Sequence, residues 1–384
     1  MNSWLSGCED RIQFGIKLLS WYDKNKRSTD WRDSGNPYHV WVSEIMLQQT
    51  RVDQMGPYFT RFINLFPTIE DLADAEEDEV LKAWEGLGYY SRARNMLRTA
   101  RQVVAEFHGK IPEAYDKLVG FPGIGQYTAA AISSIAFGHD HAVLDGNVVR
   151  VVSRLFKISS DPRRSAVKKQ MMEIAEKLLV PGRPGDFNQA MMELGACVCT
   201  PKAPKCNVCT VASKCRAHQE LNDPASLPKK QKRKMKPHYQ VVAGLIWRDH
   251  EVLIAQRPKD GMLGGLWEFP GGKQEEGESF EECLIREIRE ELDFDVVVEN
   301  LLHSVDHSYS HFSITLHLYC ARYFSGQPKT MGCVDWRWIS PDRFDDYAFP
   351  RSDLKIIEYL EKTEYFKTAL SMSENGKKSE NGKK

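Results

Sequence analysis

The hydrophobic pattern changes near residue 238 and divides the chain into two parts. Before that point, apolar residues recur three and four positions apart in segments such as 78–87, 92–107 and 165–179. This is the period of an amphipathic helix. Short stretches rich in glycine, proline, aspartate and asparagine separate these segments, as is typical of loops between helices. The pattern therefore predicts an all-helical first part.

The second part has a different pattern, in which short apolar runs flank one helical segment. Residues 238–257 predict two strands joined by a turn at Arg248-Asp249-His250. Residues 314–324 and 334–340 predict further strands, whereas residues 279–292 have the period of a helix. The second part is therefore predicted to be a mixed α/β domain.

Length and composition indicate a globular protein with several domains. At roughly 150 residues per domain, 384 residues suggest two or three domains. A content of 42% hydrophobic and 27% charged residues is ordinary for such a chain. No apolar run approaches the roughly 18 residues of a membrane helix, and the N-terminus lacks the pattern of a secretory signal. We therefore expect neither a membrane protein, nor a secreted disulfide scaffold, nor a disordered chain.

Charge is distributed unevenly between the two parts. Residues 1–237 carry 34 Lys and Arg against 27 Asp and Glu, a net charge of +7, and the remaining residues carry 18 against 26, a net charge of −8. Residues 228–237 hold six basic residues between two prolines. This segment predicts a linker that is either a solvated spacer or an electrostatic arm for a phosphate backbone. The repeated SENGKK at the C-terminus predicts a disordered tail.

Four of the nine cysteines have the spacing of metal ligands. Cys199, Cys206, Cys209 and Cys215 form the pattern C-x6-C-x2-C-x5-C. Four thiols this close together in a reducing compartment predict a metal site rather than disulfides. Spacing alone allows either zinc or a [4Fe–4S] cluster. Cys197 is expected to be a spare buried thiol.

A glycine-rich turn and two carboxylates are candidates for binding and chemistry. Residues 118–131 read LVGFPGIGQYTAAA and resemble a helix–hairpin–helix DNA-binding element, in which glycines allow close approach and the next helix start can hold a phosphate. Glu44 lies in an apolar helical run and needs a partner or a raised pKa. Asp145 lies in HAVLDGNVVR. Taken alone, a buried ion pair for Glu44 and a helix N-cap for Asp145 are the simpler interpretations.

Several long motifs together resemble one family. VSEIMLQQTRV, WEGLGYYSRARN, LVGFPGIGQYTAAAI, LDGNVVRV, FNQAMMELGACVC and the four cysteines resemble the endonuclease III superfamily of base-excision glycosylases, and within it the MutY-type adenine DNA glycosylases. The resemblance implies an all-α helix–hairpin–helix glycosylase domain over residues 1–220, with a six-helix module at about 30–138 and an iron–sulfur module from 1–29 and 139–220. It further implies a basic linker (221–237), a Nudix-like α/β domain that recognises 8-oxoguanine (238–365) and a disordered tail (366–384).

The resemblance also implies roles for individual residues. Tyr127 stands where the bifunctional lyases of the superfamily carry a nucleophilic lysine, so the enzyme is expected to be monofunctional. Glu44 would protonate adenine N7 and Asp145 would stabilise the oxocarbenium-like sugar, with Tyr127 and Asn147 as supports. The four cysteines would hold a [4Fe–4S] cluster. The residues expected to contact DNA are Arg32, Gln49, Thr50, Leu87, Tyr89, Gly123, Gly125, Gln126, Ser310 and His311.

Leu87 and Tyr89 are expected to act as a wedge in the base stack. Core packing is the alternative for Tyr89 and for its neighbour Tyr90. The sequence Tyr309-Ser310-His311 takes the place of the family's Phe-Ser-His hairpin, in which Ser310 would bond to 8-oxoguanine and His311 would lie beside it.

Residues 272–294 match the Nudix signature G-x5-E-x7-R-E-U-x-E-E-x-G-U, where U is a bulky apolar residue, except that Asp293 replaces the second glycine. Glu287, Glu290 and Glu291 share one helix face and would bind Mg²⁺. A Mg²⁺ cofactor is expected only if the domain hydrolyses nucleotides. Asp293 lies where the helix is expected to end with a positive φ, which Asp tolerates better than most residues.

The implied substrate is adenine paired with 8-oxoguanine or guanine in double-stranded DNA, and the adenine would be flipped out before hydrolysis. Three alternatives remain. They are a thymine or oxidised-pyrimidine glycosylase of the same superfamily, a fusion that also hydrolyses 8-oxo-dGTP, and a non-catalytic iron–sulfur protein that binds DNA. We expect a monomer without membrane association, located with the DNA in the cytoplasm of a bacterium.

Overall fold

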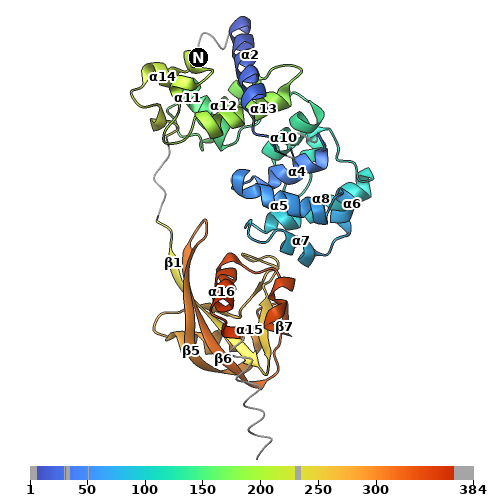
Figure 1. The fold of residues 1–384 in the computed structure, drawn as a ribbon, viewed down its shortest axis with the longest axis vertical. Helices are drawn as coiled ribbons and strands as arrows, with labels where there is room; N and C mark the ends of the chain where they lie inside the picture. The colour runs from blue at the N-terminus through green and yellow to red at the C-terminus, as the bar shows by residue number, and fades with distance from the viewer. Residues whose placement is uncertain (1–6, 30, 32–34, 51, 230–234, 367–384) are drawn as a thin grey trace, which may run out of the picture. The chain divides into compact units, whose positions relative to one another are not determined.

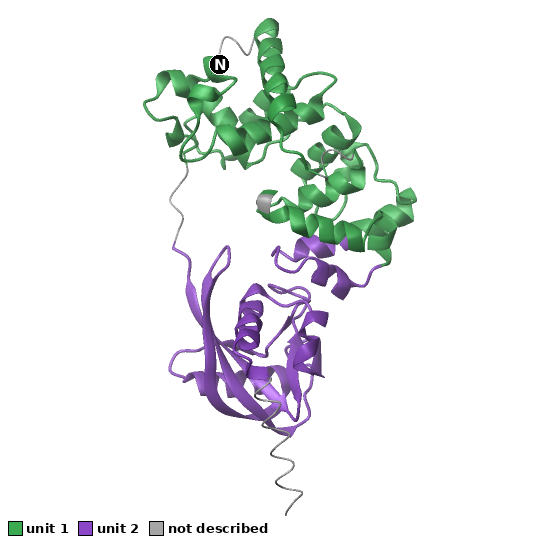
Figure 2. Cartoon of the chain, in the orientation of Figure 1, with its two compact units in different colours: residues 1–74, 98–233 green, residues 75–97, 234–384 purple. Residues whose placement is uncertain are grey.

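The computed structural model describes residues 7–29, 31, 35–50, 52–229 and 235–366. It divides into two compact units (Figures 1 and 2). Unit 1 comprises residues 1–74 and 98–233, and unit 2 comprises residues 75–97 and 234–384. This division groups residues 75–97 with the C-terminal part of the chain. The domain boundaries predicted from the sequence stay a prediction. Arg32 and, apart from residue 366, the predicted tail lie outside the described residues.

Unit 1 is helical, as predicted. Its helices are α2 (Cys8–Asn25), α4 (Pro37–Met46), α5 (Val52–Leu65), α6 (Ile69–Asp74), α9 (Tyr115–Val119), α10 (Gln126–Phe137), α11 (Gly146–Leu155), α12 (Ser165–Leu178), α13 (Pro184–Glu193) and α14 (Arg216–Glu220). A π-helical turn (Leu194–Val198) follows α13, and short 3-10 turns occupy Cys206–Val208, Ala212–Lys214 and Pro224–Ser226. α8 (Ser91–Phe107) begins among the residues of unit 2 and ends among those of unit 1.

Local signals in the sequence account for the helix ends that matter to the site. Asn36 caps α4 by accepting a hydrogen bond from the Tyr38 N–H at 2.9 Å, and Pro37 starts the helix, where its missing N–H costs nothing. Gly138 ends α10 with a φ of 72°, a conformation that glycine adopts without strain. The apolar faces of α2 and α10–α13 meet in a core that includes Leu18, Val151, Met171 and Phe187.

Unit 2 contains a mixed β-sheet with helices. The strands are β1 (His238–Arg248), β2 (Glu251–Gln256), β3 (Trp267–Glu268), β4 (Gly271–Lys273), β5 (Phe294–Ser308), β6 (Ser313–Gly326) and β7 (Asp335–Ile339), and the helices are α7 (Glu77–Ala83), α15 (Phe280–Leu292) and α16 (Arg351–Lys362). The sheet order is β3-β2-β1-β6-β5, with β4 paired to β1 and β7 paired to β2. β1 and β6 run parallel, and the other pairs are antiparallel.

The alternation of side chains along β1 explains the two cores of unit 2. Val242 and Ile246 belong to a buried cluster with Leu284 and Ile288 of α15. The intervening Ala243 and Leu245 belong to a second cluster with the apolar residues of α16. Successive strand residues point to opposite faces, so each helix covers one face of the sheet. The predicted all-helical first part and mixed α/β second part are confirmed.

Two further observations concern the predictions made from the sequence. The predicted turn at residues 248–250 joins β1 to β2, and Asp249 adopts a φ of 56° there. Within the described part of the chain, no helix is both long enough and apolar enough to cross a membrane.

Candidate active site

The predicted chemical residues of unit 1 meet in one cavity. Glu44 near the end of α4, Tyr127 in the first turn of α10 and Asp145 immediately before α11 all line a cavity of about 1030 Å³. Met192 and Glu193, at the end of α13, line the same space. Residues separated by a hundred positions in the sequence are thus brought together by the packing of four helices.

Glu44 is buried and hydrogen-bonded to Tyr127. Only 4% of Glu44 is exposed, and the Tyr127 hydroxyl donates a hydrogen bond to Glu44 Oε2 at 2.8 Å. The same hydroxyl lies 3.5 Å from Met192 Sδ. A buried carboxylate needs such donors, and Tyr127 supplies one. The hydroxyl also fixes the direction in which the carboxylate faces the cavity.

Asp145 is both a helix cap and a cavity residue. Its Oδ1 accepts a hydrogen bond from the Val148 N–H at 2.7 Å, and its Oδ2 accepts one from Asn147 Nδ2 at 2.8 Å. The N-cap interpretation is therefore correct for the backbone of α11, and it coexists with the catalytic interpretation because the same residue lines the cavity. Two donors hold the carboxylate in one orientation.

Arg150 connects Asn147, which bonds to the Asp145 carboxylate, to the loop that carries the cysteines. Its Nη2 donates to Asn147 Oδ1 and to the Gly195 carbonyl, both at 2.7 Å, and its Nε donates to the Cys199 carbonyl at 2.7 Å. Gly195 lies so close to Asn147 that a Cβ at position 195 would stand 2.6 Å from Asn147 Cβ. The π-helical turn can therefore reach α11 only with glycine at this position.

An ion pair at the cavity, between Arg27 and Glu193, was not predicted from the sequence. Arg27 donates to both carboxylate oxygens of Glu193, from Nε at 2.5 Å and from Nη2 at 3.0 Å, and the Glu193 side chain is only 1% exposed. The Cys197 thiol donates to Glu193 Oε1 at 3.4 Å. Glu193 could have been noticed, because it is a carboxylate within the apolar run FNQAMMELGACVC, the signal that singled out Glu44. Arg27 gives no such signal, since its partner lies far along the chain.

The predicted DNA-contact residues of unit 1 lie at this cavity or beside it. Gln49, Thr50, Gly123 and Gly125 line it. Gln49 follows the end of α4 with a φ of 63°, and Gly123 has a φ of 76° in the hairpin. Among the described residues, no side chain caps the start of α10 at Gly125. The first N–H groups of α10 are therefore suited to hold a phosphate.

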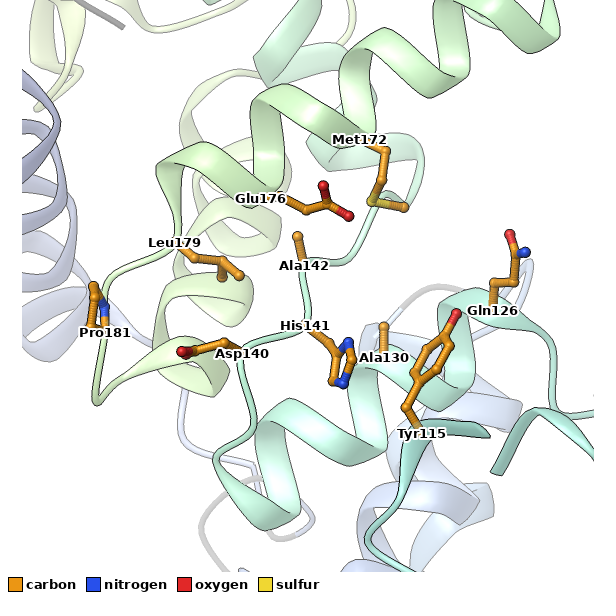
Figure 3. A pocket seen from close by; sticks show the side chains of 10 residues that line it. All are labelled: Tyr115, Gln126, Ala130, Asp140, His141, Ala142, Met172, Glu176, Leu179 and Pro181. Atoms are coloured by element: carbon orange, nitrogen blue, oxygen red, sulfur yellow. The ribbon is translucent and has the colours of Figure 1, made fainter. Parts of the chain in front are cut away.

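A second cavity of about 590 Å³ lies between α9, α10, α12 and the segment 140–142 (Figure 3). Tyr115 and His141 stack along it, with ring centroids 4.6 Å apart and an angle of 20° between the rings. Within the described ranges, Gln126 is the one predicted site residue that lines it. Because both candidate catalytic carboxylates line the larger cavity instead, the larger cavity is the candidate active site.

The four predicted cysteines face a common space, a cavity of about 30 Å³. Burial raises the pKa of Cys206 and Cys215, and it raises the pKa of Cys209 to about 11. Thiolates here therefore need positive charge close by. Arg154, which is 1% exposed, supplies part of it by donating from Nη1 to Cys199 Sγ at 3.2 Å.

These features fit a group held by four thiolates. Arg154 also donates to the carbonyls of Thr200, Pro201 and Leu227, so the loop around the thiols is fixed by a buried guanidinium. Cys197 bonds to Glu193 instead and does not line the cysteine cavity. Among the described residues, no group of three or more His, Cys, Asp or Glu side chains is arranged to hold a metal ion. The fit therefore rests on the type of donor, four thiols that line one space beside a buried arginine, and not on a ligand geometry.

In unit 2, two predicted lesion-contact residues meet each other. The turn of residues 309–312, which we call the recognition hairpin, joins β5 to β6, and the hydroxyls of Ser310 and Tyr89 form a hydrogen bond. Tyr89 is 38% exposed with a φ of 50°, whereas Leu87 is 9% exposed. Tyr90 is the buried member of the tyrosine pair. Tyr89 is thus the more accessible of the two predicted wedge residues.

The other predicted residues of unit 2 are His311 and the glutamates of the Nudix signature. His311 is exposed in the recognition hairpin. The carboxylates of Glu278, Glu287 and Glu290 gather around Arg286, which bonds to them at 2.7, 3.0 and 3.2 Å respectively. Burial and the nearby Glu287 raise the pKa of Glu291 to about 7. The three predicted Mg²⁺ ligands therefore share one helix face, with an arginine interposed between two of them.

Comparisons with known proteins place this geometry in context. Residues 42–177 match the HhH-GPD superfamily base excision DNA repair protein family, and residues 241–359 match the NUDIX domain. The adenine DNA glycosylase of Rattus norvegicus is 36% identical over 93% of this chain and 79% of its own length. That of Homo sapiens is 35% identical over 90% of this chain and 73% of its own length. The solved structure of a thermostable thymine-DNA glycosylase is 28% identical, with a TM-score of 0.49 over 54% of this chain and 96% of that one.

Proposed function

This chain belongs to the adenine DNA glycosylases of base excision repair, and we propose that it removes adenine paired with 8-oxoguanine or guanine by hydrolysing its N-glycosidic bond. The observation that carries the proposal is the meeting of Glu44, Tyr127 and Asp145 on one cavity. Glycoside hydrolysis commonly uses two carboxylates with different roles, and this cavity presents two in different surroundings.

Glu44 is proposed to act as the general acid. Adenine is a poor leaving group unless it is protonated, so a proton must reach N7 as the bond to the sugar breaks. Glu44 is buried and held by the Tyr127 hydroxyl at 2.8 Å, which orients its carboxyl group toward a base flipped into the cavity. Flipping is required because the bond cannot be reached inside the duplex.

Asp145 is proposed to stabilise the cationic sugar. Departure of adenine leaves an oxocarbenium-like centre, and a negative charge held nearby lowers the energy of that state. The Val148 N–H and Asn147 Nδ2 fix the carboxylate before the reaction, so it need not reorganise when the charge develops. Water then completes the hydrolysis and leaves an abasic site.

The proposed enzyme has no lyase activity. A Schiff base requires an amine that can attack the sugar, and position 127 holds tyrosine. Among the described residues that line the cavity there is no lysine. The strand is therefore expected to stay intact until alkali or heat cleaves the abasic site.

The cysteine cavity is proposed to hold a [4Fe–4S] cluster. When bound, the cluster would supply the positive charge that four neighbouring thiolates need and would brace the surrounding loop. Arg150 connects that loop to Asn147 through the Cys199 carbonyl and Asn147 Oδ1. The cluster is therefore proposed to support the geometry of the site and not the chemical step.

The opposite base is proposed to be read by unit 2. Ser310 and His311 would contact 8-oxoguanine and Tyr89 would enter the stack beside it, a role that its exposure and its bond to Ser310 support. Gly123, Gly125 and Gln126 would hold the backbone phosphate. We further propose that the protein acts as a monomer and works on the DNA in the cytoplasm of a bacterium.

Replacement of Asp145 tests the catalytic assignment. Asp145→Asn keeps an acceptor for the Val148 N–H, and it should abolish single-turnover excision from an A:8-oxoguanine duplex while DNA binding is largely kept. Asp223→Asn is a matched control, because Asp223 caps a 3-10 helix through the Ala225 N–H at 2.8 Å and does not line the cavity. Retained excision in Asp145→Asn would remove this residue from its role. Faster cleavage of a G:T duplex by the wild type would favour a thymine glycosylase instead.

A second function, hydrolysis of 8-oxo-dGTP by unit 2, is favoured by the intact helix of the Nudix signature. Asp293 accommodates the left-handed end of α15 with a φ of 54°, and Ser279 and Glu282 form a capping box at its start. Incubation of the full chain with 8-oxo-dGTP and Mg²⁺ should then yield the monophosphate, and Glu290→Gln should lose this product. Absence of monophosphate with the wild type would refute this second function.

A further inference from the structure

The recognition hairpin is tied to the interior of unit 2 by a chain of hydroxyl groups. The pair Ser308–Ser313 closes the ladder between β5 and β6, and the Tyr309 N–H donates to the Phe312 carbonyl at 2.9 Å across the turn. The Tyr309 ring stacks on Phe312, with centroids 4.9 Å apart, and packs against the core on the α16 side of the sheet. Tyr309 therefore points inward while the neighbouring Ser310 is exposed.

The Tyr309 hydroxyl lies at the start of α16. It lies 3.1 Å from Ser352 Oγ, and Ser352 Oγ donates to Asp353 Oδ2 at 2.9 Å. A serine hydroxyl has one proton. Since that proton goes to Asp353, the Tyr309 hydroxyl must donate to Ser352. The chain thus has one direction, from Tyr309 through Ser352 to the carboxylate.

The inner end of this chain is fixed by the fold. Ser352 is 3% exposed and Asp353 is 5% exposed, and Asp353 Oδ1 accepts a hydrogen bond from the Phe269 N–H at 3.3 Å. A buried hydroxyl without a partner is costly, so the Tyr309 hydroxyl can be buried only where Ser352 accepts its proton. The outer end is the Tyr309 hydroxyl. The next residue in the hairpin, Ser310, bonds separately through its own hydroxyl to Tyr89.

We infer that Tyr309, Ser352 and Asp353 form an anchor that fixes the recognition hairpin, and that they are positioning residues for the contact of Ser310 with 8-oxoguanine. The inference rests on the function proposed above. A phenylalanine at position 309 could fill the same apolar site, but it could not bond to Ser352. The hydrogen bond of the tyrosine hydroxyl therefore restricts the conformations of the hairpin before DNA binds. This lowers the conformational entropy that the hairpin loses on binding.

The test compares two substrates in the same protein. Single-turnover excision rates are measured for the wild type, Tyr309→Phe, Ser352→Ala and the double variant, with A:8-oxoguanine and A:G duplexes. A single hydrogen bond contributes about three- to tenfold. Tyr309→Phe should therefore lower the A:8-oxoguanine rate constant at subsaturating protein by that factor and leave the A:G rate within about twofold. The double variant should be no worse than the more impaired single variant, because both substitutions break one contact.

Tyr323→Phe is the matched control. Tyr323 lies on β6, away from the hairpin, and its hydroxyl donates to the Gly326 carbonyl at 2.5 Å, so the substitution removes one tyrosine hydrogen bond of unit 2 outside the anchor. Backbone amide exchange at residues 309–312 of the full chain gives a readout without activity. It should be faster in Tyr309→Phe and Ser352→Ala and unchanged in Tyr323→Phe.

The outcomes separate this inference from the proposed function. Equal losses on both duplexes, or unchanged rates and unchanged amide exchange in Tyr309→Phe, would overturn the anchor alone, provided that the wild type prefers the A:8-oxoguanine duplex. A wild type that excises adenine without any preference for 8-oxoguanine would overturn both the recognition role of the hairpin and the anchor.

Discussion

Tyr127 occupies the most informative single position in unit 1. Where the lyases of the superfamily carry an amine, this chain has a phenol whose hydroxyl donates to Glu44 Oε2 at 2.8 Å and lies 3.5 Å from Met192 Sδ. Under the proposed function, the residue at this position is not a nucleophile but a group that orients the general acid. Its value lies in one hydrogen bond to a carboxylate, which can be removed without disturbing the ring.

Tyr127→Phe should slow single-turnover excision about three- to tenfold, because it removes one hydrogen bond that orients the Glu44 carboxyl group, and such a bond contributes roughly 0.5–1.5 kcal/mol. The thermal midpoint should change little, since the ring still packs against the core. Rates and midpoints of the variant and the wild type are compared on the same A:8-oxoguanine duplex. An unchanged rate would show that Glu44 is held by its other contacts alone.

Asp353 should make the stability of unit 2 depend on pH. Burial raises its pKa from 3.8 to about 6, so the folded state binds the proton more tightly than the unfolded state. Its contribution to stability is complete below about pH 3.8 and is lost as the pH rises through 6. Asp353→Asn keeps an acceptor for the Phe269 N–H but cannot ionise.

The free energy of unfolding of the variant, relative to that of the wild type, should therefore increase by about 2–3 kcal/mol from pH 4 to pH 7.5. The measurement is the difference in thermal midpoint between the two full-length proteins at those two pH values. Asp345→Asn, at an exposed position three residues beyond Asp342, is the control and should show no such trend. A difference for Asp353→Asn that is the same at both pH values would contradict the assigned cause.

At the residue scale, the sequence indicated the groups that stand out from their local pattern. Glu44 interrupts an apolar helix and Asp145 precedes a helix start, and the structure shows both on the same cavity. Arg27 and Tyr309 could not be assigned in this way. Their partners, Glu193 and Ser352, lie 166 and 43 positions away, and only the fold brings them into contact.

At the element scale, the start of α11 and the π-helical turn form the framework of the site. π-helical turns often occur at functional sites, and here the turn presents the Gly195 carbonyl to Arg150 at 2.7 Å. The same arginine bonds to Asn147, which bonds to Asp145. The position of the Asp145 carboxylate therefore depends on how closely these two backbone segments approach each other.

Gly195→Ala should disturb this framework, because the added Cβ would stand 2.6 Å from Asn147 Cβ. We expect at least about a tenfold loss of single-turnover rate, since small displacements of a positioned group are costly in catalysis. Gly56→Ala is the control. Gly56 lies in α5, where an added Cβ would have no described atom within 4 Å, so the substitution should keep activity. Full activity in Gly195→Ala would mean that Asn147 can move without effect on Asp145.

Elements were easier to predict from the sequence than their partners in space. The strands 238–248 and 251–256 and the helix 280–292 follow from local periodicity and turn residues. The parallel pairing of β1 with β6 does not, because it joins segments about 75 residues apart (His238 with Ser313) and depends on which faces the two helices cover. Likewise, nothing in the sequence pattern indicated that residues 75–97 belong to unit 2.

At the scale of the whole molecule, the two parts of the chain differ in charge. The net charge of +7 on residues 1–237 and −8 on the remainder suits a first part that holds a polyanion through its basic residues. Under the proposed function, unit 1 breaks the bond to adenine and unit 2 reads the base that was paired with it. Recognition and chemistry would then reside on separate units.

The central claim is tested most directly by single-turnover excision with the purified full-length protein in excess. End-labelled duplexes with one A:8-oxoguanine, A:T or C:8-oxoguanine pair are incubated with it and then treated with alkali or left untreated. A monofunctional adenine glycosylase should give breaks in the adenine strand of the A:8-oxoguanine duplex after alkali, none without alkali, and none in the other two duplexes. An intact adenine strand after alkali, in protein that binds the duplex, would contradict the assignment of Glu44 and Asp145.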